Sequence, residues 1–395
     1  MKRKDLLLLD QTVGRVLFGI AALSARLRPA RIELPPRLGE PPRFLVIRPG
    51  GLGDAIMCIP FLRCLRETFP DAHVTVVCVA KNRAMLEMTS YHDELLVLGD
   101  SGSTIRNLRR LRRMDIDVLF DLEPHRRTSS LVSWWTSARA RVGFDTNSRR
   151  RLYTHLVAYA EDRWSESENM LRQLTVVGVP WTPGVLRPAR IEIDTDRRDA
   201  ARSRLLDAGL DPDSDFIVAI AVGALKPENL WIMSRFVELI ESILAEDSRA
   251  RVLLLGSAGD VENTNVVLGG LRNAQGVTNL VAQTPLADTL AILSLCRVLL
   301  ACDGGIVHMA AAAGCGTVSL WGPSDMHRFK PPGEEHVGVR SDYACVPCMT
   351  RERLGEFPGC PYARRCLNDL GVASVMSAYL VQKRQIETLR TKMDQ

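Results

Sequence analysis

The sequence predicts an α/β protein with two similar Rossmann-like domains in tandem, each a parallel β-sheet flanked by helices. The chain of 395 residues exceeds what one hydrophobic core usually serves. Short apolar stretches of strand length alternate with stretches of helix length, as in parallel βαβ units. This alternation starts near Phe44 and starts again near Phe216. Because ligands of parallel sheets bind beyond the carboxyl ends of the strands, we expect a site in a cleft between two facing domains.

Composition limits the classes of function. Hydrophobic residues make up 46% of the chain and charged residues 25%, which is typical of a globular protein. Lysine and arginine exceed aspartate and glutamate by 51 to 46, which gives a net charge of +5. This mild excess suits an anionic substrate or a membrane surface, but it does not indicate a nucleic-acid partner. Since no secretory signal is evident, we expect a cytoplasmic protein whose ten cysteines are reduced.

Residues 1–42 predict an N-terminal amphipathic helix followed by a proline-rich linker. Apolar side chains recur at helical spacing between residues 5 and 27, and Lys2, Arg3 and Lys4 precede them. Two alternatives remain open for this helix. It lies on the anionic inner face of the inner membrane, or it packs on the protein's own body or on a second subunit. Five prolines in RPARIELPPRLGEPPR then predict an extended linker.

The first domain is expected to span residues 43–190, with strands at FLVIR, HVTVVCV, IDVLFDL and RARVGF and a helix at IMCIPFLRCLRETFP. The second is expected to span residues 191–370, with strands at FIVAIAVG, ARVLLLG, VTNLV, VLLACD and GTVSLWG. Its helices are predicted from about Ile232 to Glu246, through NTNVVLGGL and PLADTLAILSLC, and from about Ile306. Residues 371–395 predict a C-terminal helix.

The segment RPGGLGDA places three glycines between the first strand and its helix, with Asp54 in the first helical turn: Gly50, Gly51 and Gly53. Glycines let a ligand approach the backbone, and a helix N-terminus offers free amides to an anion. The segment does not match GxGxxG, so it does not establish a nucleotide fingerprint. Asp54 is either a helix cap or a general base that faces the cleft, and one carboxylate can do both.

A second turn, ACDGGIVHMAAAAG, follows the strand that ends at Cys302. Gly304 and Gly305 lead into a helix whose exposed amides, with His308 one turn in, favour a diphosphate. Asp303 is expected to cap the helix, to hold the His308 ring or to bind a sugar hydroxyl. The alternative is a tight strand-to-helix turn in which the histidine is a packing residue.

These two segments, in this order and at this distance, resemble the bacterial ADP-heptose:lipopolysaccharide heptosyltransferases (glycosyltransferase family 9) from about Phe44 to Asp369. The resemblance implies a GT-B architecture, with the acceptor in the N-terminal domain and the nucleotide sugar in the C-terminal domain. It also implies inverting transfer with no cofactor or metal required for catalysis. Inversion needs one base to deprotonate the acceptor as the sugar leaves its diphosphate, so a single carboxylate is chemically sufficient.

The resemblance assigns roles to individual residues. It makes Asp54 the general base, with Gly51 and Gly53 on the acceptor side. It aligns Glu262 with an acid that binds the nucleoside ribose. Four further residues are implied at the sugar and diphosphate: Asp303, Gly304, Gly305 and His308.

Two positions depart from the family pattern. The family carries serine or threonine where this chain has Gly304, which removes one hydroxyl donor to the phosphate. The family also has a lysine shortly before a tryptophan, whereas here Asn229 and Leu230 precede Trp231. Lys226, displaced by about a turn, is the candidate to neutralise the diphosphate.

A cysteine-rich segment covers residues 345–366, as in related members of the family. Its spacing, CxxC followed by eleven residues, C, five residues and C, suits a structural zinc or iron ion. Reduced thiols or a redox-labile pair remain the alternative. The other six cysteines are expected in the core. The four candidate ligands are Cys345, Cys348, Cys360 and Cys366.

Two arginine-rich runs fall in the predicted acceptor domain, IRNLRRLRRMD and NSRRRLYTH. Arg109 and Arg110 of the first run are candidates for the acceptor side, where a phosphorylated glycolipid or the membrane leaflet that carries it would suit them. A solvated helix face is the alternative. Without interleaved aromatic residues, neither run indicates RNA binding.

The leading hypothesis is a cytoplasmic, membrane-peripheral glycosyltransferase that moves heptose or a related sugar from ADP-heptose to a lipopolysaccharide core or another surface glycan. A second hypothesis keeps the fold but makes the acceptor a protein side chain. A third is a non-catalytic GT-B scaffold, which the missing hydroxyl at Gly304 and the missing lysine motivate. Binding of nucleotide sugars separates the third from the other two.

Overall fold

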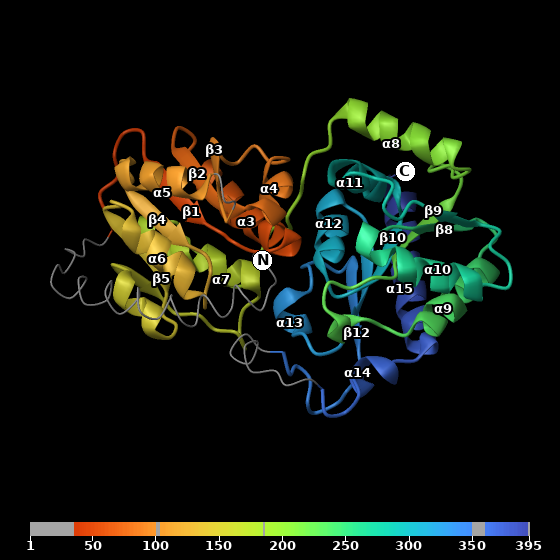
Figure 1. The fold of residues 1–395 in the computed structure, drawn as a ribbon. Helices are drawn as coiled ribbons and strands as arrows, with labels where there is room; N and C mark the ends of the chain where they lie inside the picture. Colours follow the sequence, from red (N-terminus) through yellow and green to blue (C-terminus); the bar gives the residue numbers. More distant parts are fainter. Residues whose placement is uncertain (1–34, 100–102, 185, 350–359, 394–395) are drawn as a thin grey trace. The chain divides into compact units, whose positions relative to one another are not determined.

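The computed structural model describes residues 35–99, 103–184, 186–349 and 360–393, so the predicted N-terminal helix lies outside the described residues. The chain divides into two compact units, Met1–Arg187 (unit 1) and Pro188–Gln395 (unit 2) (Figure 1). Among the helices of the described ranges, none combines the length and the apolar character that crossing a membrane requires.

Unit 1 contains a six-stranded parallel sheet in the order β3-β2-β1-β4-β5-β6. Its central strand is apolar and almost wholly buried, and it pairs with a neighbour on each side, Leu45 lying opposite both Thr75 and Leu119. Parallel strands joined by helices bury both faces of such a sheet. The strands are β1 (Arg43–Ile47), β2 (His73–Val79), β3 (Glu94–Leu98), β4 (Val118–Asp121), β5 (Ala140–Phe144) and β6 (His155–Val157).

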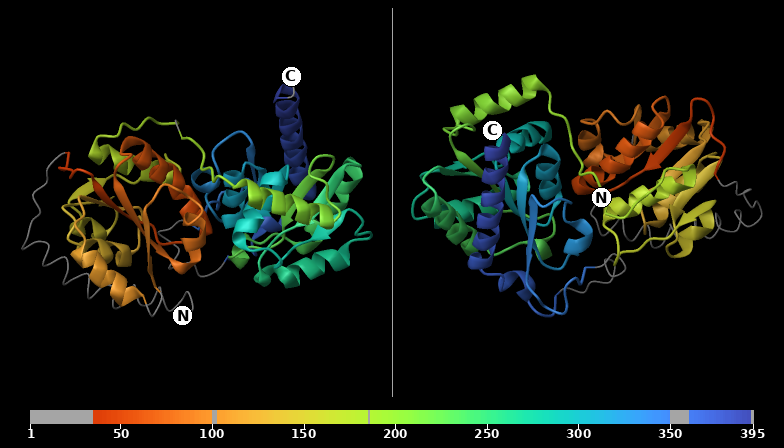
Figure 2. Two further views of the ribbon diagram at one scale, coloured as in Figure 1. Left: turned by 90° about the horizontal axis from the view of Figure 1, so that it is seen from above. Right: turned by 180° about the vertical axis from the view of Figure 1, so that it is seen from behind.

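Helices cover both faces of this sheet (Figures 1 and 2). The first and longest follows β1 directly and packs against the short helix α7. The α-helices are α3 (Leu52–Thr68), α4 (Ala80–Leu86), α5 (Thr104–Arg113), α6 (Arg127–Trp135) and α7 (Glu166–Leu171), and the 3-10 helices are η1 (Ser148–Leu152) and η2 (Arg172–Val177).

Unit 2 repeats this architecture with six parallel strands in the order β12-β11-β10-β7-β8-β9. The two central strands, β10 and β7, are buried along their whole length. Because they pair with each other in parallel, both end at the carboxyl edge of the sheet, where ligands of such folds bind. The strands are β7 (Phe216–Ala221), β8 (Ala250–Leu254), β9 (Val277–Asn279), β10 (Val298–Cys302), β11 (Gly316–Trp321) and β12 (His336–Arg340).

The helices of unit 2 form two groups. Helix α11 contacts both α8 and α12, and α15 packs against α9, β11 and β12. The end of α15 projects from the unit (Figure 2). The helices are α8 (Thr195–Asp207), η3 (Pro227–Asn229), α9 (Met233–Glu246), η4 (Ala258–Asp260), α10 (Val261–Gly270), α11 (Leu286–Leu295), α12 (Gly305–Ala313), α13 (Met326–Phe329), α14 (Arg365–Asn368) and α15 (Val372–Met393).

Candidate active site

Asp54 lies in the first turn of α3, at the carboxyl end of β1. One carboxylate oxygen, Oδ2, accepts a hydrogen bond of 2.8 Å from the backbone N–H of Gly51, the residue that precedes the helix. The other oxygen, Oδ1, lies 2.8 Å from Nη2 of Arg48. The Asp54 side chain is 27% exposed, so a substrate can reach a carboxylate whose orientation is already set by two donors.

The glycines around Asp54 have different roles. A Cβ on Gly50 would come within 2.5–2.6 Å of the Asp54 side chain, so this position must stay glycine for the carboxylate to fold back onto the turn. A Cβ on Gly51 would make only an ordinary contact, 3.8 Å from Oδ2 of Asp54. Gly53 was expected in the turn, but α3 begins at Leu52 and therefore includes it. The helix begins earlier because the capping bond from Gly51 to Asp54 replaces a side-chain cap.

The second turn follows β10 in unit 2. Asp303 directly follows the strand, Gly304 precedes the first helical residue, and Gly305 opens α12. The first N–H groups of a helix have no intrahelical acceptor, so this end of α12 can bind an anion. His308 lies in the next turn and is 7% exposed.

Gly304 is not required by the backbone. Its φ of 175° is extended, and a Cβ would lie 3.7 Å from the carbonyl oxygen of Cys302, an ordinary contact. The serine or threonine of the family would therefore fit at this position. The missing hydroxyl is a difference in chemistry and not a consequence of limited space.

Asn229 is a candidate site residue that the sequence did not reveal. Its side-chain Nδ2 donates to Oδ2 of Asp303 at 2.8 Å and to Oγ of Ser324 at 3.2 Å. The residue is 4% exposed, and within the described residues its Oδ1 has no hydrogen-bond partner. A buried amide oxygen without a donor costs free energy, and a ligand hydroxyl could supply that donor. The signal that was available is its place two residues before Trp231.

Lys226 follows the carboxyl end of β7, which lies next to β10, and Glu262 follows the carboxyl end of β8, which lies on the other side of β7. Lys226 immediately precedes η3, and Glu262 is in the first turn of α10 and exposed. A Cβ on Gly223, in the loop after β7, would overlap the carboxylate of Asp260, in the loop after β8, so the two loops touch. The topology thus brings both predicted donor residues to the edge that carries Asp303.

The sequence model of glycosyltransferase family 9 (heptosyltransferase) matches residues 104–356. The chain belongs to this family. Lipopolysaccharide heptosyltransferase 2 of Salmonella typhimurium is 25% identical over 307 residues, which cover 73% of this chain and 85% of that protein. This chain is therefore a glycosyltransferase.

Solved structures of the family show the same fold. A glycosyl transferase family 9 protein from Veillonella parvula has a TM-score of 0.71 and 21% identity, covering 86% of this chain and 96% of its own. The ADP-heptose LPS heptosyltransferase II of E. coli has a TM-score of 0.70 and 22% identity, covering 87% of this chain and 99% of its own. Two parallel six-stranded sheets with flanking helices give this chain the GT-B fold of heptosyltransferases.

The four candidate metal ligands, Cys345, Cys348, Cys360 and Cys366, lie near enough for their thiols to influence one another. Burial raises the pKa of the Cys366 thiol, and Cys348, Cys360 and Cys345 raise it further. In residues 35–99, 103–184, 186–349 and 360–393, however, no three His, Cys, Asp or Glu side chains are arranged to hold a metal ion. The other three thiols nevertheless lie near enough to act on the titration of Cys366.

The remaining cysteines behave as the sequence predicts. Five of the six are buried and Cys64 is half-buried. Burial raises the pKa of Cys58, Cys296 and Cys302 to about 12, so these thiols stay protonated at neutral pH. They are core residues of this family-9 protein and not nucleophiles.

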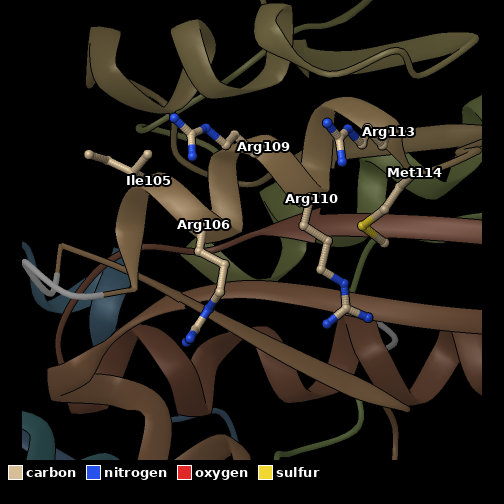
Figure 3. Close-up of a pocket in the computed structure, with 6 residues that line it drawn as sticks. All are labelled: Ile105, Arg106, Arg109, Arg110, Arg113 and Met114. Atoms are coloured by element: carbon tan, nitrogen blue, oxygen red, sulfur yellow. The ribbon is translucent and has the colours of Figure 1, made fainter.

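The first arginine run forms α5, whose exposed face lines a hollow of about 650 Å³ (Figure 3). Arg110 is not free for an acceptor, since its Nη2 donates to Glu94 Oε2 at 2.8 Å. Arg106, Arg109 and Arg113 are exposed around the same hollow, and Ile105 beside them is 62% exposed. The helix therefore presents positive charge together with an exposed apolar side chain.

Proposed function

We propose that this family-9 enzyme transfers heptose from ADP-heptose to a lipopolysaccharide core, with inversion at the anomeric carbon and with Asp54 as the general base. The acceptor hydroxyl loses its proton to Asp54 while its oxygen bonds to the anomeric carbon. The bond from that carbon to the diphosphate oxygen breaks, and ADP leaves with the electron pair. The observation that carries this proposal is the oriented, partly exposed carboxylate at the carboxyl end of β1.

Unit 2 supplies the groups proposed for the donor. The N-terminus of α12 and His308 would stabilise the charge that develops on the leaving diphosphate. Asp303 and the unpartnered Oδ1 of Asn229 would accept hydroxyl groups of the sugar. Lys226 would neutralise the diphosphate, and Glu262 would bind the ribose. None of these steps uses a metal ion.

Calorimetry with a panel of nucleotide sugars tests the donor assignment. ADP-heptose is expected to bind more tightly than UDP- and GDP-linked sugars, because the family relatives include an enzyme named for ADP-heptose. Tighter binding of a UDP- or GDP-linked sugar would show that the donor is that sugar and not ADP-heptose. Absence of binding to every member of the panel would favour the non-catalytic scaffold.

We also propose that α5 holds this cytoplasmic enzyme against the anionic membrane leaflet that carries a glycolipid acceptor. Exposed Arg106, Arg109 and Arg113 match phosphate groups in charge, and the neighbouring Ile105 can enter the interface. Reversing the charge of the three arginines to glutamate should lower partitioning onto phosphatidylglycerol vesicles by about 100-fold or more.

Co-sedimentation of the full chain with these vesicles measures the effect. The matched control reverses three exposed arginines on α8 of unit 2, Arg197, Arg198 and Arg204. Equal loss of binding in both triple variants would show that net charge alone attracts the chain, and unchanged binding in the α5 variant would contradict the proposal.

The cysteine segment supports a second, structural proposal, namely one zinc or iron ion held by thiolates of Cys345, Cys348, Cys360 and Cys366. The other three thiols lie near enough to Cys366 to raise the pKa of its thiol. Thiolates are ligands that both zinc and iron accept. Elemental analysis of purified protein should find about one such ion per chain, lost in the Cys345→Ser, Cys348→Ser double variant. Well-folded protein that contains neither metal would contradict it.

A further inference from the structure

Arg48 is a wholly buried arginine that joins two carboxylates. Its side chain is 0% exposed, and Nη2 lies 2.8 Å from Asp54 Oδ1 and 3.4 Å from Glu166 Oε1. Nε donates to the carbonyl of Asp54 at 3.2 Å, and Nη1 donates to the carbonyl of Leu122 at 2.8 Å. The planar guanidinium is therefore fixed by contacts with α3, α7 and the end of β4, and it cannot turn without breaking several of them.

Glu166, the second carboxylate that Arg48 contacts, is also held in place by its neighbours. Its side chain is 1% exposed, and Tyr159 donates its hydroxyl to Oε2 at 2.7 Å. The ring of Tyr159 packs against Phe144, with 4.8 Å between ring centroids, and against His125 at 5.4 Å. Glu166 also begins α7, where a carboxylate is favoured by the helix dipole. Its position thus depends on side chains from three segments of unit 1.

The charged groups around Asp54 differ in their exposure to solvent. Glu166 and Arg48 are buried, whereas Asp54 reaches solvent. Cys58, which lies one turn further along α3, senses the charges of both Arg48 and Asp54, but burial raises the pKa of its thiol to about 12, so it adds no charge at neutral pH. The buried Arg48 guanidinium is therefore shared between the buried Glu166 and the partly exposed Asp54.

We propose that Arg48 and Glu166 are positioning residues that set the orientation and the proton affinity of Asp54. Arg48 directs Oδ1 and favours the ionised carboxylate, which the base needs before reaction. Glu166 shares the guanidinium charge, so Asp54 keeps enough proton affinity to accept the hydroxyl proton. The inference deepens the proposed function and rests on the role of Asp54 as the base.

The direct test is the titration of Asp54, followed by ¹³C NMR of the full-length protein labelled at its aspartate carboxyl carbons. The Asp54→Asn variant identifies the Asp54 signal. Arg48→Gln removes a neighbouring positive charge, so the titration midpoint should rise by about 1 to 3 pH units. Glu166→Gln removes a competing negative charge, so the midpoint should fall. Simple disruption of the fold would not move the two variants in opposite directions.

Arg149→Gln is the matched control. Arg149 is also 0% exposed in unit 1, and its Nη2 lies 2.8 Å from a buried carboxylate, that of Asp121. This variant loses a buried ion pair of the same kind without touching Asp54, so its midpoint should stay where the wild type has it. Because Arg48→Gln can fail to fold, Arg48→Lys and Glu166→Gln keep the test decisive.

Turnover separates this inference from the proposed function. With ADP-heptose and a heptose-free lipopolysaccharide core, the acid limb of the kcat profile should move with the NMR midpoint in each variant. Arg48→Gln should lower kcat by about 100-fold, and Arg48→Lys should recover part of it. Midpoints that do not move, or that move the same way in both variants, would overturn the inference. An active Asp54→Asn variant would instead overturn the proposed function.

Discussion

Replacing Asp54 by asparagine is expected to lower the rate of heptose transfer by about 100- to 10,000-fold, the range that a general base contributes. Asparagine has nearly the same size and can still accept a hydrogen bond from Gly51 or Arg48, but it cannot take the acceptor proton. ADP-heptose binding should stay within a few-fold of wild type, since the groups proposed for the donor belong to unit 2. Initial rates of ADP release and donor calorimetry measure the two effects.

Loss of a helix cap alone must be separated from loss of the base. Asp194 caps α8 by accepting from the N–H of Arg197 at 2.8 Å, and it lies outside the site described above. Asp194→Ala removes this cap, so it should lose some stability and keep its activity. Undiminished turnover by Asp54→Asn would remove Asp54 from the chemistry and leave it as a helix cap.

Two substitutions in unit 2 should weaken donor binding in distinguishable ways. His308→Ala removes the side chain proposed at the diphosphate, so the Kd of both ADP and ADP-heptose should rise by about 10-fold or more, as expected for a hydrogen bond to a charged group. Asp303→Asn should raise the Kd of ADP-heptose by a similar factor and leave that of ADP unchanged, because Asp303 is assigned to the sugar.

Calorimetry with ADP and ADP-heptose measures both constants, and thermal melting confirms that each variant is folded. His327→Ala, which removes an exposed histidine on α13, is the control. If Asp303→Asn weakened ADP as much as ADP-heptose, the aspartate would act on the diphosphate region. If neither substitution changed a Kd, the donor site would lie elsewhere.

The central strands of both sheets could be predicted from the sequence because they are buried on both faces. The apolar runs at His73–Val79 and Val298–Cys302 coincide with β2 and β10, and the restart near Phe216 coincides with β7. The strands β3, β6 and β12 were not predicted. All three are edge strands with exposed or half-buried positions, as in Glu94–Leu98, where four of five residues are only half-buried although Leu95–Leu98 is apolar.

The two turns of the site were also predictable, because each needs glycine and polar residues directly after a buried strand. The contacts that define their chemistry were not. Arg48 and Glu166 are 118 residues apart, and Asn229 and Asp303 are 74 apart. No local pattern links such pairs, since they meet only when separate strands and helices come together at the carboxyl edge of a sheet.

Mass spectrometry of the acceptor measures heptose transfer directly. The full-length protein is incubated with ADP-heptose and a lipopolysaccharide core that lacks heptose, and both the acceptor mass and the released ADP are measured. The acceptor should gain a heptosyl residue in step with ADP release, and the Asp54→Asn variant should show neither. An acceptor of unchanged mass, with ADP-heptose bound and intact, would contradict the proposed function.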